Sequence, residues 1–316
     1  MSRFPELVMR RKAKGMHRTA YYPLKAFETR DLSDYRGPVM VWDIDKTYLS
    51  TRLSSTWGMA RIPIEAAVDK MPVPGMPQVL RGLRKGPGAG VACTPLYFVS
   101  ASPPCLKRTL ERRMLMDGVE QDGITFKDWS RTLTSFTPYR LFDQQGYKFC
   151  ALLEGRTRRP LSVEYLFGDD FEMDSPAYYL YSRIINNRLS QDEAAGVMKE
   201  EGIRKHDLRY ALDLLKRMPA QTGRVERIFI HLEQGTMPEE FNCYGNMLIP
   251  VRGAYQLALA LLQLDLVDSD LVRRTAEEVR RSGSMEDLES ERRDAIDRGL
   301  ITLSKAPPPG PSRGVD

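Results

Sequence analysis

The chain has 316 residues, of which 42% are hydrophobic and 28% are charged, and it carries a formal net charge of +5. These values are ordinary for a globular protein, and the length allows a large buried core. The modest positive charge favours anionic partners, phosphorylated ones included, without identifying any.

The four cysteines are scattered without a C-x-x-C pair, and the basic beginning of the chain lacks the apolar run of an export signal. We therefore expect free thiols and a cytoplasmic protein. No stretch reaches the ~18–20 apolar residues that span a bilayer. The most apolar one, 255–266, is interrupted by polar residues and predicts a buried helix. The basic run 10–14 leaves peripheral membrane contact open, but it has no interleaved aromatic residues and so gives no specific nucleic-acid signal.

The first predicted strand, 38–43, ends in two carboxylates, Asp43 and Asp45. Side chains two residues apart on an extended segment point to the same side, so both would project from the carboxyl end of the strand. Open α/β sheets bind their ligands at this edge. Two acids this close favour a bound Mg²⁺ and a reaction in which one aspartate attacks while the other transfers protons.

Two more strand ends carry polar groups. The predicted strand 96–100 ends in Ser100, and Ser102 is expected to cap the helix that follows Pro103. The predicted strand 163–167 is followed by Gly168 and a run of acids that contains Asp169, Asp170 and Asp174. Asp174 alone could also be read as the N-cap of the next helix.

Lys148 lies in a short predicted helix with Leu152 and Leu153 on its buried side. Most lysines are solvated surface charges. A lysine that reaches several acids and a phosphate would instead neutralise charge there.

Strand and helix signals alternate over 37–235, which predicts an α/β fold with a parallel sheet covered on both faces. Residues 1–36 form a basic lead-in, 236–302 a helical part that packs on the core or is appended to it, and 303–316 a disordered tail. About 25 residues between Thr47 and Thr94 are available for a small lid, with a helix expected near 63–71. Further strands are expected near 124–126 and at 227–232, and further helices at 76–83, 190–202, 204–217, 252–264 and 267–281.

The ordered series DIDKT, FVSAS, YK and GDDFEMD resembles the four motifs of the haloacid dehalogenase (HAD) superfamily of phosphotransferases. Over about residues 35–235 the chain is most similar to the phosphatidate-phosphatase-type catalytic domain first described in a yeast actin-patch protein. Lys46 stands where that subfamily often has a second acid. The resemblance implies a HAD-like Rossmannoid three-layer sheet with a small flap.

The resemblance also implies site roles. Asp43 would attack phosphorus and become an aspartyl-phosphate, and Asp45 would serve as acid and then base. Mg²⁺ would lie between Asp43, the backbone carbonyl of Asp45 and Asp169, with Asp170 or Asp174 orienting its waters. The residues implied to bind the phosphoryl oxygens are Thr47, Ser100, Ala101 and Lys148.

The expected function is a Mg²⁺-dependent phosphomonoester hydrolase acting on phosphatidate or another phosphorylated lipid. Phosphates of nucleic acids, proteins or small molecules remain open as substrates. The alternatives are a HAD-like binding module that has lost turnover and an enzyme that transfers phosphate to an acceptor other than water. A binding module would be expected to have lost the nucleophile, the acid or the lysine, and none is lost here.

Overall fold

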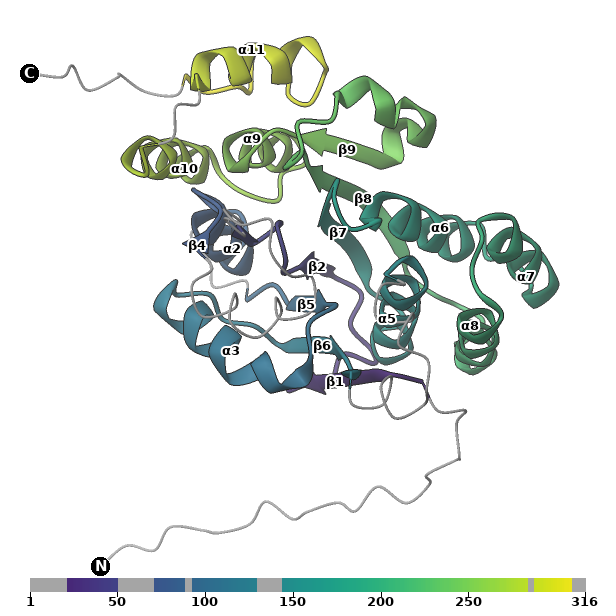
Figure 1. Cartoon of the computed structure of the whole chain (residues 1–316). Coiled ribbons are helices and arrows are strands. Elements are labelled where there is room, and N and C mark those ends of the chain that lie inside the picture. Colours follow the sequence, from purple (N-terminus) through teal and green to yellow (C-terminus); the bar gives the residue numbers. More distant parts are fainter. Residues whose placement is uncertain (1–21, 51–70, 89–92, 130–143, 284–286, 309–316) are drawn as a thin grey trace, which may run out of the picture.

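The computed structural model describes residues 22–50, 71–88, 93–129, 144–283 and 287–308. These residues form three layers, with a seven-stranded sheet between two layers of helices (Figure 1). The α/β fold predicted from the sequence is confirmed, and it is consistent with a Rossmann-like HAD fold.

The sheet has the order β1-β6-β5-β2-β7-β8-β9. Only β1 runs antiparallel to its neighbour, whereas the other neighbouring pairs are parallel. The five predicted strands are confirmed as β2, β5, β6, β7 and β8, while β1 and β9 were not predicted. The bounds are β1 Leu24–Glu28, β2 Pro38–Asp43, β5 Leu96–Ser100, β6 Gly123–Lys127, β7 Val163–Asp169, β8 Arg224–His231 and β9 Leu248–Val251.

Each face of the sheet is covered by its own helices (Figure 1). The helices are α2 Met76–Lys85, α3 Lys107–Met116, α5 Gln145–Arg158, α6 Asp174–Asn186, α7 Gln191–Glu200, α8 Lys205–Arg217, α9 Ala254–Gln263, α10 Ser269–Arg281 and α11 Leu288–Asp297. Most predicted helices are confirmed within a few residues, and the capping box of Ser190 with Glu193 begins α7 as expected. The short helix α11 was not predicted.

The central strand β2 contributes to two hydrophobic cores because successive side chains point to opposite faces. Met40 and Trp42 belong to the core under α2, α3, α9, α10 and α11. Val39 and Val41 belong to the core under α5, α6, α7 and α8. Burial on both faces holds β2 in place, and with it the carboxylates at its end.

The C-terminal part contributes directly to the sheet and its cover. Strand β9, beyond the boundary expected at residue 235, pairs in parallel with β8. Helices α9, α10 and α11 share a core with Trp42. The expectation of disorder from residue 303 onward is wrong for 303–308, because Arg292 donates hydrogen bonds to the carbonyl oxygens of Ala306 and Pro307, at 3.0 and 3.1 Å.

A small two-stranded sheet follows β2, formed by β3 (Leu49–Ser50) and β4 (Met71–Pro72). It stands where the sequence predicts a flap. The expected helix near 63–71 falls almost entirely outside the described residues, and its last residue, Met71, is in β4. No helix in the described ranges is long and apolar enough to cross a membrane.

Candidate active site

The functional side chains meet at the carboxyl edge of the sheet, where the chain reverses its direction of winding. From β2 the chain proceeds to β5 and β6 on one side, and it returns to β7, β8 and β9 on the other. Such a switch point leaves a crevice beyond the strand ends. Asp43 ends β2, Ser100 ends β5 and Asp169 ends β7.

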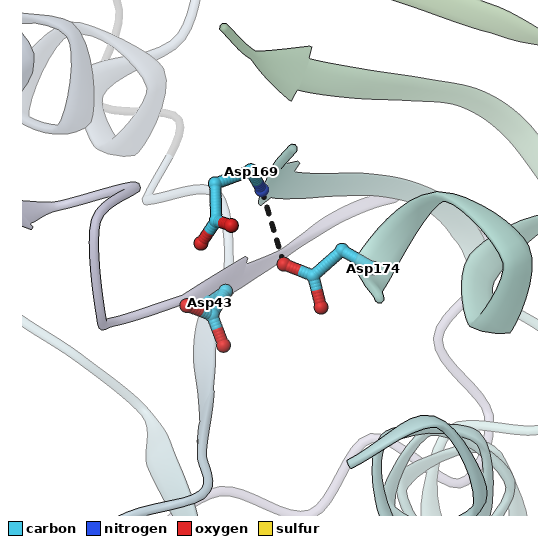
Figure 2. A group of neighbouring side chains, drawn as sticks. All are labelled: Asp43, Asp169 and Asp174. Carbon is cyan, nitrogen blue, oxygen red and sulfur yellow. Dashed lines mark hydrogen bonds between the residues drawn. The ribbon is translucent and has the colours of Figure 1, made fainter. Parts of the chain in front are cut away.

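Three buried carboxylates lie together at this point, those of Asp43, Asp169 and Asp174 (Figure 2). Each offers an oxygen, and these oxygens all lie within 4.8 Å of one another. The backbone N–H of Asp169 donates a 3.0 Å hydrogen bond to Oδ2 of Asp174. A Cβ at Gly168 would stand 2.4 Å from this oxygen, so the glycine permits the close approach of α6 to the end of β7.

Asp174 is the first residue of α6 and not its N-cap, which is Met173 in a left-handed conformation (φ 62°). The reading of Asp174 as a simple N-cap is therefore wrong. Its carboxylate points into the acidic group instead. A negative charge in the first turn is also favourable for the helix.

Lys148, in the second turn of α5, is fully buried and reaches this group, as predicted. Its Nζ lies 3.0 Å from Oδ1 of Asp43 and 3.2 Å from Oε2 of Glu172, and it forms a close ion pair with Asp174. Burial alone would lower the pKa of the ammonium. The neighbouring carboxylates, Asp174 and Asp43 foremost, outweigh it and raise the pKa of Lys148 well above its ordinary value.

We call Asp43, Asp169, Glu172 and Asp174, with Lys148, the acidic cluster. Four carboxylates lie near one ammonium, and three of them contact it, so negative charge is in large excess in a buried place. Burial, partly opposed by Lys148, raises the pKa of all four carboxyl groups, that of Asp174 to about 7. Oδ2 of Asp43 and Oδ2 of Asp169 are buried and accept no hydrogen bond from any described residue. A divalent cation would satisfy both the excess charge and the unused oxygens.

Asp45 lies beside the cluster and is 8% exposed. Its Oδ2 accepts hydrogen bonds from the hydroxyls of Ser100, at 3.1 Å, and Ser102, at 3.3 Å. Ser102 does not cap a helix as predicted, because a 3-10 turn starts at Pro104 and α3 only at Lys107. The second serine of FVSAS thus orients Asp45 instead.

The other residues predicted to bind phosphate surround this place. Thr47 is buried, and its Oγ1 has no hydrogen-bond partner among the described residues. The carbonyl oxygen of Ala101 accepts a 2.8 Å hydrogen bond from the indole of Trp129. The phenol of Tyr147, next to Lys148, donates to the carbonyl oxygen of Ser100 at 2.9 Å, which ties α5 to the end of β5.

Asp170 lies apart from the cluster. Its carboxylate accepts hydrogen bonds from the backbone N–H of Gln234 and from the hydroxyl of Thr236, so it organises the connection after β8. Of the two acids offered by the sequence for orienting metal waters, the structure brings only Asp174 to the cluster. Sequence reasoning missed Glu172, whose signal was the unusually acidic fourth motif.

A contact between His231 and Lys46 joins the end of β8 to the turn that follows β2. The ring Nδ1 of His231 lies 3.0 Å from the carbonyl oxygen of Lys46. His231 is the last residue of β8. Lys46 has a left-handed backbone (φ 62°), and its Nζ lies 2.7 Å from the centre of the Phe171 ring.

Residues 39–190 match the family described as phosphatidate phosphatase APP1, catalytic domain. Over these residues the chain is similar to the APP1 catalytic-domain family. No curated protein and no solved structure matches the chain. The matched segment contains the DIDKT strand end, Ser100, Lys148 and the whole acidic fourth motif.

The match to the APP1 family supports phosphatase activity, and it agrees with a divalent metal in the buried acidic group. The matched segment ends within the loop after α6. Strands β8 and β9 and helices α7 to α11 therefore complete, outside the match, the sheet and the two cores that hold the site.

Proposed function

We propose that this protein is a Mg²⁺-dependent phosphomonoester hydrolase of the HAD type that works through an aspartyl-phosphate on Asp43. The observation that carries the proposal is the buried excess of carboxylates around one lysine at the switch point of the sheet. A catalytically inactive binding module would have no need to keep this costly arrangement.

Asp43, Asp169 and Asp174 would hold the metal, because one oxygen of each lies within 4.8 Å of the others and Oδ2 of Asp169 accepts no hydrogen bond from any described residue. Hard carboxylate oxygens suit Mg²⁺. When bound, the cation would offset the negative charge of the cluster and of the transferring phosphoryl group.

Asp43 is the nucleophile in this proposal. Its carboxylate is fixed by burial and by Lys148, and Oδ2 is free to form the bond to phosphorus while the bond from phosphorus to the ester oxygen breaks. Lys148 would offset the charge that develops on the equatorial phosphoryl oxygens.

Asp45 would donate a proton to the departing ester oxygen and later remove one from the attacking water. Its oxygen Oδ2 accepts hydrogen bonds from Ser100 and Ser102, which fix the direction of the carboxyl group that would transfer the proton. The Thr47 hydroxyl would donate to a phosphoryl oxygen, since it has no described partner of its own.

The family description directs the choice of substrate to phosphatidate or another phosphorylated lipid. Phosphatidate is a phosphomonoester, so it matches the reaction derived from Asp43 and Asp45. Release of inorganic phosphate from phosphatidate would be compared with release from phosphorylated sugars, nucleotides and phosphopeptides.

The decisive experiment traps the covalent intermediate. Purified protein is mixed with Mg²⁺ and a labelled phosphomonoester, quenched in acid, and analysed for acid-stable, hydroxylamine-sensitive label. We expect label on Asp43 and none in Asp43→Asn. Asp170→Asn serves as the matched control, because its carboxylate lies outside the cluster, and it should keep both label and turnover.

Metal dependence is tested in the same assay. We expect turnover to stop after chelation and to return with Mg²⁺, while Ca²⁺ inhibits because it takes more ligands at longer distances. Full turnover after exhaustive chelation, or turnover by Asp43→Asn close to the wild-type rate, would refute the proposed function.

A further inference from the structure

Large apolar side chains are exposed on the connections that follow β7 and β8, next to the acidic cluster. Phe171, Met173 and Met237 are exposed by 52, 53 and 56%. Phe171 and Met173 lie on the connection from β7 to α6. Met237 lies on the connection after β8, which is joined to the first connection by the hydrogen bond from Thr236 to Asp170, at 2.6 Å. We call Phe171, Met173 and Met237 the apolar rim.

Along the connection after β7, successive side chains point alternately inward and outward. Glu172 and Asp174 turn inward to Lys148, whereas Phe171 and Met173 between them turn outward. Met173 adopts a left-handed backbone, which is uncommon for residues other than Gly, Asn and Asp. The fold thus carries local backbone strain where it displays two apolar side chains directly above the buried acids.

A cation accompanies the rim. Nζ of Lys46 lies 2.7 Å from the centre of the Phe171 ring, and Lys46 directly follows Asp45. Aromatic, thioether and ammonium groups side by side suit the boundary between lipid headgroups and acyl chains.

We propose that the apolar rim, with Lys46, docks the entrance of the site onto the surface of a bilayer that contains phosphatidate. This inference rests on the proposed function, because it uses the family's phosphatidate as the substrate. In phosphatidate the phosphomonoester is separated from two acyl chains only by a glycerol unit. If the phosphate is to reach Asp43, the surface around the entrance must meet the acyl region. Phe171, Met173 and Met237 provide that surface, and Lys46 complements the anionic headgroups.

The test compares a rim variant with a matched variant elsewhere. The rim variant combines Phe171→Ser, Met173→Asn and Met237→Ser, in which asparagine tolerates the left-handed backbone. The control combines Leu115→Ser and Met116→Ser at the end of α3, where both side chains are exposed, by 78 and 73%. Binding to phosphatidylcholine vesicles with and without phosphatidate is measured by flotation in the Asp43→Asn background, which prevents turnover.

We expect the rim variant to lose about tenfold or more in affinity for phosphatidate vesicles and the control to lose nothing. With Asp43 present, the rim variant should hydrolyse a soluble aryl phosphate at the wild-type rate and vesicle phosphatidate about tenfold more slowly. A single Phe171→Trp variant should keep vesicle binding and show a blue shift of its emission on vesicles.

Equal vesicle binding by rim variant and control would overturn the proposal. A parallel loss of aryl phosphate turnover would overturn it as well, because the rim would then support the reacting groups. If the wild type forms a dimer, and the rim variant loses the dimer but binds vesicles as before, the apolar rim is a contact with a second copy of the chain and the proposal fails. If the wild type hydrolyses neither substrate, the proposed function fails, while the flotation comparison still decides whether the rim binds lipid.

Discussion

The two ends of strand β7 carry buried charge in opposite arrangements. At its amino end, Glu164 is paired with the buried Arg156 at 2.7 Å. The remaining donors of Arg156 reach the carbonyl oxygen of Ser162, at 2.8 Å, and the hydroxyl of Tyr181, at 2.9 Å. The Tyr181 hydroxyl in turn donates to Glu164, at 2.6 Å.

At its carboxyl end, Asp169 lies in a cluster of four carboxylates, three of which contact Lys148, and Oδ2 of Asp43 and Oδ2 of Asp169 accept no hydrogen bond from any described residue. Burial of charge costs free energy unless pairing and hydrogen bonds offset it. At the amino end Arg156 balances the charge of Glu164, and Oε1 of Glu164, which accepts no hydrogen bond from a described residue, lies 3.9 Å from Nε of Arg159. This end balances its charge within the chain, so it has a structural role. The carboxyl end balances its charge only with a ligand, so its excess charge points to function.

The largest expected effect concerns Asp45, which belongs to the carboxyl end. Asp45→Asn should slow both formation and breakdown of the aspartyl-phosphate by ~10²–10⁴-fold per step, because the same carboxyl group is acid and then base. An activated aryl phosphate needs no protonated leaving group, so it should give a burst of product and accumulated phosphoprotein. Wild-type steady-state turnover of that substrate would remove Asp45 from this role.

The second prediction addresses the amino end. Arg156→Met should lower the free energy of unfolding by about 3–5 kcal/mol, because it leaves the Glu164 carboxylate buried without its partner. The turnover of the remaining folded protein should be unchanged. Denaturant unfolding and aryl phosphate assays at the same temperature separate the two readouts. A fall in turnover without a fall in stability would contradict the proposed division of roles between the two ends.

The third prediction uses metal and pH at the carboxyl end. Since burial raises the pKa of Asp174 from 3.8 to about 7, the metal-free folded state retains a proton that the unfolded chain releases. The stability from this group is complete below pH 3.8 and is lost as the pH rises through about 7. Mg²⁺ binds the deprotonated form, so it should stabilise the protein more at pH 8 than at pH 5. At pH 8, a concentration of 100 times Kd should add ~2.7 kcal/mol to the free energy of unfolding. Equal stabilisation at both pH values would count against the acidic cluster as the metal site.

The fourth prediction concerns Asp43→Asn, which should raise the free energy of unfolding slightly while it removes activity. In the absence of metal, Asp43→Asn should stabilise the protein at neutral pH by about 1 kcal/mol, since it removes one of four mutually repelling buried acids. The same substitution should abolish turnover. Asp170→Asn, with its carboxylate on the backbone of Gln234, should not stabilise. Chelated samples of both variants and the wild type, unfolded in urea at the same pH, test this difference.

Some features could be predicted because they depend on neighbours in the chain. Alternation along an extended segment and the apolar composition of 38–43 and 163–167 located β2 and β7 and the acids at their ends. Asp43 and Asp169 could be brought together from such strand ends because parallel strands share one carboxyl edge. Strand β9 was missed because its four residues include Pro250 and give no alternation of their own.

Other features depended on contacts between distant segments. Asp170 and Glu172 are chemically similar and only two residues apart, yet Asp170 turns to the connection after β8 and Glu172 to Lys148. Nothing local distinguishes them, because the choice is made by Gln234, Thr236 and α5, which lie far away in sequence. Likewise, Ser102 bonds to Asp45 and does not cap a helix.

By itself the sequence determined the parallel α/β sheet and the edge where the acids of β2 and β7 lie, since these follow from periodicity and from the order of strand ends. The tertiary structure alone decided which acids share Lys148, which side chains form the apolar rim and how the C-terminal segment completes the sheet. These outcomes depend on packing between segments separated by tens to hundreds of residues, where the direction of a side chain is set by its partners rather than by its neighbours in the chain.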